Sequence, residues 1–397
     1  MIENRQTARA NGNTALEAQL SASIKRLVKR DKKRWKLDLL EDFSASKSKW
    51  SGIKLQKSDF KPTFYYLRDI NGRKVPLDKK AETLAEYLEL KQWAPVNNLP
   101  PTRDNLTPAT ISNPMIEIGS ITLEETRGAI QTLKSNKAPG PDGLVIELYK
   151  ALDVDNLTTL ARILNQMWST ESYPDGFTDA QVVSLYKKGN PELPENYRPI
   201  SLLNCSYKIL TKIIKNRLAD ALDHLISDTQ FGFRRSRSTA EPLFCVRRLQ
   251  ELAEAGNENI ILIFLDWEKA FDKVSHERLI EALQRMKIHQ KIIDNVKALY
   301  AKPYFRIVHK ENPSDWKKQH SGIRQGCPLS PYLFIIMMNV LFFDVKLKNN
   351  DPHFHKTINN INFQELLYAD DTLIIAKNTK TLKTTSNSSK KNLRITT

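Results

Sequence analysis

Residues 364–376 constrain this chain most strongly, and their sequence is QELLYADDTLIIA. Two short apolar runs flank a turn, and the adjacent acids Asp370 and Asp371 stand at that turn. The pattern predicts a β-hairpin with buried apolar strands and paired carboxylates at its tip. Neighbouring carboxylates in such a setting repel each other. They therefore stay ionised together only beside a strong positive charge, usually a divalent metal ion.

A third acid follows an earlier apolar run. Residues 260–265 are all apolar, and Asp266 comes directly after them. The run predicts a strand that is buried on both faces, with Asp266 at its carboxyl end. We therefore expect Asp266 to meet the acids of the hairpin at one metal site. Two nearby acids, Glu268 and Asp272, are interpreted as ordinary surface residues.

These two motifs resemble the catalytic palm of a reverse transcriptase from a non-LTR (LINE-type) retrotransposon. The resemblance rests on FLDWEKAFD at residues 264–272 and on YADD at residues 368–371. It implies an α+β fold with the fingers and palm of a right-hand polymerase, in which an antiparallel palm sheet has helices behind it. The implied activity is RNA-directed DNA synthesis, with an RNA template, a DNA primer strand and dNTPs as partners.

The chemistry implied by the resemblance is two-metal nucleotidyl transfer onto a primer 3′-hydroxyl. Asp266 and Asp370 are expected to bridge the two ions, with Asp371 as the third acid. A ligand set of oxygen atoms without Cys or His favours Mg²⁺, and Mn²⁺ is possible. An isolated pair of aspartates would more often be a turn, so this expectation depends on Asp266 and on the glycine-rich segment between the two motifs.

The overall charge agrees with a nucleic-acid partner. Lys and Arg outnumber Asp and Glu by 61 to 45, which gives a formal net charge of +16. Ribosomal, chromatin and membrane-surface proteins share such an excess. The three cysteines are widely separated, which fits a reducing compartment. The apolar run at residues 333–343 is too short to cross a bilayer, so we expect an intracellular protein, nuclear or cytoplasmic, with no membrane partner.

Composition and motifs divide the chain into five predicted regions. A basic run at residues 25–36 is either a solvated helix face or a phosphate-contacting surface, and the sequence leaves both interpretations open. The resemblance ends near residue 377 without a legible thumb, which predicts a fragment or a decayed copy. The predicted regions are a basic helical extension (1–93), a Pro-rich connector (94–117), fingers (118–258), palm (259–377) and a polar tail (378–397).

A basic hairpin is predicted from residues 181–186 and 197–203, which alternate as strands do. Lys187 and Arg198 would then lie on the same working face. Such a hairpin could simply be solvated. The resemblance implies instead that it grips an incoming nucleotide, because an ammonium and a bidentate guanidinium suit a triphosphate.

Three further segments carry expected ligand contacts. The resemblance implies that Phe271 lies under the sugar of the nucleotide and excludes a 2′-hydroxyl, although its position alone suggests a core aromatic. It also implies that the loop containing Gln325 and Gly326 lies beneath the templating base. Four arginines are predicted to contact nucleic acid: Arg234, Arg235, Arg237 and Arg324.

Two other functions remain open from the sequence. The first is a folded nucleic-acid-binding remnant that does not polymerise. The second is a metal-dependent nuclease or phosphatase that uses the same acids, which the predicted fingers motifs disfavour.

Overall fold

The chain divides into two compact units, Met1–Thr63 and Phe64–Thr397. The computed structural model describes residues 4–5, 7–8, 11, 13–44, 66–96, 107–257, 259–309, 312–348 and 365–376. In the first unit the main described element is the long helix α2 (Thr14–Ser44). The boundary predicted after residue 93 is therefore wrong, because Leu67, Leu84 and Trp93 are buried in the main core of the second unit. The predicted tail at 378–397 lies outside the described residues.

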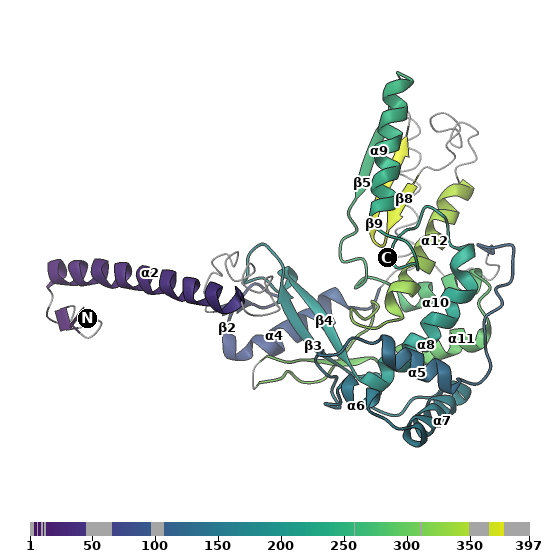
Figure 1. Ribbon diagram of the computed structural model, residues 1–397, viewed down its shortest axis with the longest axis horizontal. Helices are drawn as coiled ribbons and strands as arrows, with labels where there is room; N and C mark the ends of the chain where they lie inside the picture. Colours follow the sequence, from purple (N-terminus) through teal and green to yellow (C-terminus); the bar gives the residue numbers. More distant parts are fainter. Residues whose placement is uncertain are drawn as a thin grey trace. The chain divides into compact units, whose positions relative to one another are not determined.

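Most helices of the second unit surround one large core (Figure 1). Thr122 and Glu125 form a capping box at the start of the helix that begins at Leu123, and the Ser275 side chain caps another helix. The helices are α4 (Lys80–Tyr87), α5 (Leu123–Thr132), α6 (Ile146–Lys150), α7 (Val154–Thr170), α8 (Cys205–Leu222), α9 (Ala240–Ala255), α10 (His276–Arg285), α11 (Gln290–Ala301) and α12 (Ser330–Lys348). Short 3-10 or π turns are η1 (Leu77–Lys79), η2 (Leu88–Gln92), η3 (Pro194–Asn196) and η4 (Asp223–Leu225).

Three sheets are present in the described part of the second unit. A two-stranded sheet joins β1 (Tyr66–Arg68) to β2 (Lys74–Pro76). A mixed sheet has the order β4-β3-β6-β7 and is formed by β3 (Ala180–Tyr186), β4 (Tyr197–Leu203), β6 (Tyr304–Ile307) and β7 (Lys317–Lys318). The antiparallel pairing of β3 with β4 confirms the predicted basic hairpin.

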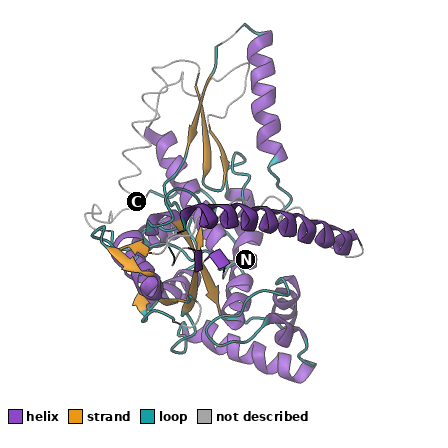
Figure 2. Cartoon of the chain, turned by 90° about the vertical axis from the view of Figure 1, so that its left-hand side faces the viewer, coloured by secondary structure: helices purple, strands orange, loops and turns teal. Residues whose placement is uncertain are grey.

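The predicted acid-bearing strands form the third sheet, which is antiparallel throughout. Its order is β5-β9-β8, from β5 (Ile261–Leu265), β9 (Asp371–Ala376) and β8 (Glu365–Tyr368). A small apolar cluster that includes Phe231, Leu249 and Leu366 packs α9 against this sheet, and Figure 2 shows the helix running alongside the strands. The two acidic motifs therefore sit on neighbouring strands.

Strand β5 differs from its prediction. The apolar run predicts burial on both faces, but within the described residues β5 pairs only with β9, at one edge of the sheet. The Phe264 side chain is 75% exposed. The apolar run therefore indicates a strand correctly, whereas its burial depends on neighbours that the run itself does not specify.

Helix α12 forms the apolar centre of the main core. Leu333, Ile335 and Ile336 are fully buried, as the nearly uniform apolar sequence predicts. The helix is longer than the apolar run alone, and by length and composition its segment Ser330–Leu347 could span a membrane. However, 67% of that segment is buried inside the protein, which is the environment of a core helix.

Candidate active site

The turn between β8 and β9 holds Asp370 at a fixed place. Tyr368 pairs with Asp371, so the hairpin reverses through Ala369 and Asp370 alone. Ala369 has a φ of 59°, a left-handed conformation that is uncommon for alanine. The buried Gln230 side chain accepts hydrogen bonds from the backbone N–H groups of Gly232 (2.9 Å) and Ala369 (3.2 Å). The loop that contains Gln230 and Gly232 therefore holds the backbone of the β8–β9 turn in place.

Gly232 permits this close approach. A Cβ atom at this position would lie only 2.2 Å from the backbone nitrogen of Ala369. Any larger residue would push the loop away from the turn.

Asp266 is placed by the pairing of β5 with β9. The last paired residues are Leu265 and Thr372, so Asp266 and Asp371 each lie one residue beyond the end of the ladder. The Trp267 indole N–H donates to the hydroxyl of Thr372 at 2.9 Å, which ties the chain after Asp266 to β9. The sheet therefore brings the two acidic motifs to the same end.

A pocket of about 520 Å³ opens at this end of the sheet. This volume lies within the usual range for small-molecule sites. The lining comes from the β3–β4 hairpin, the segment after β5, the loop before α12, the turn after β8, and single residues from η2 and the loop before α9. Predicted site residues that line it are Lys187, Arg198, Asp266, Phe271, Arg324, Gln325, Gly326 and Asp370.

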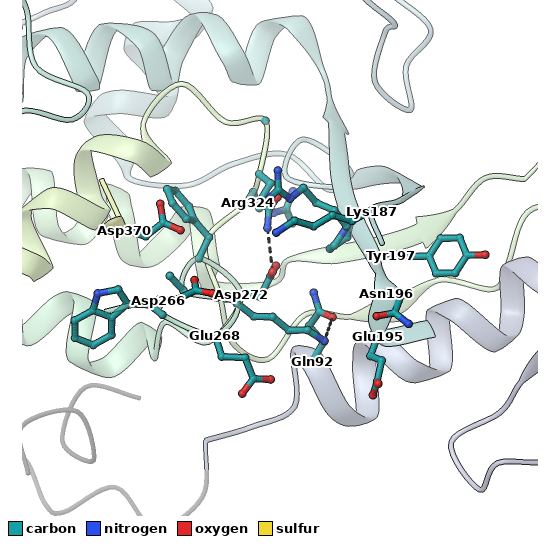
Figure 3. Close-up of a pocket in the computed structure, with 18 of the residues that line it drawn as sticks. Gln92, Lys187, Glu195, Asn196, Tyr197, Asp266, Glu268, Asp272, Arg324 and Asp370 are labelled. Carbon is teal, nitrogen blue, oxygen red and sulfur yellow. Dashed lines mark hydrogen bonds between the residues drawn. The ribbon is translucent and has the colours of Figure 1, made fainter. Parts of the chain in front are cut away.

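The carboxylates and the hairpin cations occupy different parts of the pocket. Figure 3 shows Asp266 and Asp370 at one end and Lys187 towards the other. Neither aspartate makes an ion pair with a described residue. Asp371 does not line the pocket, and no three His, Cys, Asp or Glu side chains within the described ranges are grouped closely enough to hold a metal ion. The structure thus brings together two of the three predicted acids.

The hairpin presents its two cations on one face. Arg198 pairs with Leu185, and the N–H of Lys187 donates to the carbonyl of Asn196, so the Lys187 and Arg198 side chains point the same way. Both residues are exposed. Among the described residues, neither side chain has a hydrogen-bonding or ion-pairing partner, so both are available to an anion.

Phe271 is held between two other aromatic rings. It stacks on Phe334 with ring centroids 4.6 Å apart and meets Phe233 edge-on at 6.1 Å. Its ring is only partly buried and contributes to the pocket wall. Packing therefore fixes the orientation of an aromatic surface in the pocket.

Asp272 was interpreted as a surface acid, and that interpretation is wrong. The residue is only 3% exposed. One carboxylate oxygen accepts a hydrogen bond from the Trp93 indole and the other accepts from the Gln325 side-chain amide, both at 2.9 Å. We call these three residues the Asp272 bridge. No periodicity in the surrounding sequence indicates this burial.

The surroundings of Asp272 set its charge. Burial raises its pKa to about 6, although Trp93, Lys269, Gln92 and Arg198 favour the ionised form. Burial also lowers the pKa of Lys269, whose ammonium donates to Tyr87 (2.9 Å) and Gln92 (2.8 Å). The segment that ends at Trp93 therefore contributes to the site, which sequence reasoning missed because it placed this segment in a separate extension.

The four predicted nucleic-acid arginines have different environments. Arg234 is buried, pairs with Asp223 at 3.0 Å and donates to backbone carbonyl groups. Arg324 is 1% exposed and donates to the Thr178 carbonyl. Both guanidiniums are therefore buried, although Arg324 still lines the pocket, and contact of these two residues with a template strand stays a prediction. Arg235 and Arg237 have side chains 58% and 30% exposed, and both make ion pairs.

Comparison with known proteins places the chain in a family. Residues 185–395, more than half of the chain, match the family described as reverse transcriptase (RNA-dependent DNA polymerase). The chain belongs to this family. It is also 30% identical over 279 residues to a probable RNA-directed DNA polymerase from transposon BS of Drosophila melanogaster, an overlap of 65% of this chain and 29% of that protein.

Other relatives of this chain come from further non-LTR elements. The RNA-directed DNA polymerase from mobile element jockey of Drosophila melanogaster is 29% identical over 317 residues, or 78% of this chain and 33% of that protein. A Pol polyprotein from a type-1 R2 retrotransposable element of Nasonia vitripennis is 24% identical over 241 residues, or 60% and 22%. The chain thus spans about a third or less of the length of these relatives. The resemblance drawn from the motifs is confirmed, as is an α+β fold of the reverse transcriptase type.

Proposed function

We propose that this chain is the polymerase core of a non-LTR retrotransposon reverse transcriptase, which adds deoxynucleotides to a primer 3′-hydroxyl along an RNA template. One observation supports this above all. One pocket brings together the fixed ring of Phe271, the carboxylates of Asp266 and Asp370, and the hairpin cations, and these groups come from segments far apart in the sequence. None of these four charged groups has an ion-pair partner among the described residues. A nucleoside triphosphate carries features that match each of these groups.

The triphosphate would bind at the hairpin cations, Lys187 and Arg198. A guanidinium can contact two phosphate oxygens at once, whereas an ammonium acts as a compact charge. Both groups are exposed and without partners among the described residues, so binding an anion breaks no ion pair within that part of the chain. We assign this hairpin to the fingers, within residues 118–258, and the acid-bearing sheet to the palm, within residues 259–377.

The carboxylates of Asp266 and Asp370 fit a hard divalent cation. Mg²⁺ commonly uses one or two carboxylates and completes its coordination with substrate phosphates and water. When bound, two such ions supply activation of the 3′-hydroxyl and neutralisation of the departing pyrophosphate. We propose Asp371 as the third ligand, since it adjoins Asp370 in the chain, and this requires its side chain to turn towards the pocket.

The remaining predicted roles follow from position. Phe271 would lie under the sugar and exclude a 2′-hydroxyl, because its ring is fixed by Phe233 and Phe334. Arg235 and Arg237 would contact template phosphates, since their guanidiniums reach the surface. Such chemistry on nucleic acid would take place inside the cell.

Primer extension on an RNA template with Mg²⁺ tests the proposal. Wild type should incorporate dNTPs, Asp370→Asn should lose incorporation, and Asp78→Asn serves as a matched control because Asp78 is exposed and does not line the pocket. Incorporation that is unaffected in Asp370→Asn would refute the assigned site. Binding of primer–template without incorporation, in wild type as well, would favour the inactive remnant.

Sugar selection gives an independent test of the pocket wall. Phe271→Ala should admit ribonucleotides, because the ring that would meet a 2′-hydroxyl is removed. Comparing kcat/KM for a dNTP and its ribonucleotide measures this directly. An unchanged ratio would contradict the role of Phe271.

A further inference from the structure

The Asp272 bridge joins three distant parts of the chain beneath the pocket. Trp93 follows η2, Asp272 lies in the turn after β5, and Gln325 lies in the loop before α12. Backbone contacts support the same junction. The N–H of Ser321 donates to the carbonyl of Trp93 at 3.1 Å, and the N–H of Ile323 donates to the carbonyl of Phe271 at 2.8 Å. The bridge is therefore held in a rigid frame.

A carboxylate at this position determines the orientation of the Gln325 side chain. An ionised carboxylate only accepts hydrogen bonds, so Gln325 must turn its NH₂ group towards Asp272. The carbonyl oxygen at the other side of the same amide then points away from Asp272. This oxygen makes no hydrogen bond with a described residue, and Gln325 lines the pocket.

The backbone position of Gln325 is also fixed by its neighbours. Its carbonyl accepts a hydrogen bond from the N–H of Ser201 in β4 at 2.8 Å. The next residue, Gly326, has a φ of 134°, and a Cβ there would lie 2.3 Å from the Ser201 carbonyl oxygen. Rotation of the side chain itself is therefore the main freedom that remains.

We propose that Asp272 is a positioning residue that fixes the Gln325 amide with its carbonyl oxygen towards the bound nucleotide. The proposal rests on the proposed function, and it adds a residue that does not itself act on the reacting atoms. Trp93 holds the second carboxylate oxygen, so that Asp272 is oriented by one donor while it orients the other. The oxygen of Gln325 then presents a neutral acceptor to a hydrogen-bond donor on the nucleotide.

Exchanging the carboxylate of Asp272 and the amide of Gln325 between the two positions gives a specific prediction. In Asp272→Asn, the new amide oxygen would accept from Trp93 and the new NH₂ would face Gln325, so the Gln325 amide would have to reverse. In Gln325→Glu, two carboxylates would face each other. In the double variant, the carboxylate introduced at position 325 would accept from the amide introduced at position 272. It would again offer an oxygen to the pocket, with the net charge of wild type. The oxygen in the pocket is thus lost in one single variant and restored in the double variant.

The test is a double-mutant cycle measured by two methods. KM and kcat for dTTP are measured on a poly(rA)–oligo(dT) template with Mg²⁺, and dTTP binding to a complex with a chain-terminated primer is measured by calorimetry. Each single variant should raise KM and Kd about tenfold, the scale of one hydrogen bond to a charged or fixed partner. The double variant should return to within about threefold of wild type.

A matched control separates positioning from loss of stability. Asp344→Asn makes the same substitution in an acid outside the pocket, which is partly buried, pairs with Arg285 and joins α12 to α10. It should lower the urea midpoint of unfolding without changing KM. The same KM increase in Asp344→Asn as in Asp272→Asn would overturn the proposal.

The outcomes also distinguish this proposal from the proposed function. If wild type binds and incorporates dTTP but the double variant is as impaired as the two single variants together, the positioning role is wrong and the polymerase assignment stands. If wild type binds no dTTP, the proposed function fails and the positioning role fails with it.

Discussion

Two groups of charged residues in the pocket differ in their contacts with the rest of the protein. Asp266, Asp370, Lys187 and Arg198 have no ion-pair partner among the described residues, whereas Asp272 is buried and accepts hydrogen bonds from two fixed donors. A charge without a protein partner is available to a ligand, while a bridged and buried charge orients its neighbours. We therefore expect substitutions of the first kind to change activity alone, and substitutions of Asp272 to change both stability and activity.

The largest effect is expected at the two pocket carboxylates. Asp266→Asn should reduce kcat by about a thousandfold or more, the scale on which charge stabilisation contributes to phosphoryl transfer. Its unfolding free energy should stay near that of wild type, because no ion-pair partner among the described residues is lost. Since the two acids are proposed to act on the same ions, Asp266→Asn with Asp370→Asn should be no worse than either alone. Losses that multiply would indicate separate roles.

A pH titration of stability addresses Asp272. Its folded-state pKa is raised from 3.8 to about 6, so the folded protein binds this proton more tightly than the unfolded chain does. The tighter binding of this proton therefore stabilises the folded protein fully below pH 3.8, and this stabilisation is lost as the pH rises through about 6. Relative to Asp272→Asn, the unfolding free energy of wild type should fall by about 3 kcal/mol between about pH 4 and pH 7. Urea denaturation of both proteins measures this, and a constant difference would contradict the burial of a titrating Asp272.

The hairpin cations should affect nucleotide binding at an intermediate level. Arg198→Lys keeps the charge but loses the bidentate contact, so KM for dNTP should rise by about tenfold with little change in kcat. Steady-state incorporation at varied dNTP concentrations measures both constants. If the lysine variant has the KM of wild type, Arg198 acts only as a point charge or makes no contact.

The smallest effect is expected at Arg235. Its neighbour Arg234 differs from it in burial, so the two residues again compare an exposed charge with a buried one. Arg235 has a side chain 58% exposed and Arg234 one 3% exposed. Arg235→Ala should reduce affinity for a primer–template a few-fold and lower the slope of log affinity against log salt by about one. Arg234→Ala should instead lower stability, because it removes the guanidinium that donates to the Asp223 carboxylate and to three backbone carbonyl groups. Equal salt slopes in wild type and Arg235→Ala would remove Arg235 from the interface.

Features that depend on local sequence could be predicted, whereas features that depend on distant partners could not. The two hairpins follow from apolar periodicity, because local patterns determine local structure. The convergence of Asp266 with Asp370 follows from two short motifs. The burial of Asp272, Arg234 and Arg324 could not be predicted, because it depends on partners up to 179 residues away, as in the bond from Trp93 to Asp272. The segment before Trp93 was assigned to an extension for the same reason, since its helix α4 also packs against η3 and β6, which come much later in the chain.

The most direct test of the central claim is a crystal structure of this chain with Mn²⁺ and a dNTP, in which anomalous scattering locates the metal. We predict a metal peak at a coordination distance of about 2 Å from carboxylate oxygens of both Asp266 and Asp370, with the triphosphate reaching Lys187 and Arg198. A bound dNTP whose metal contacts neither aspartate would contradict this assignment.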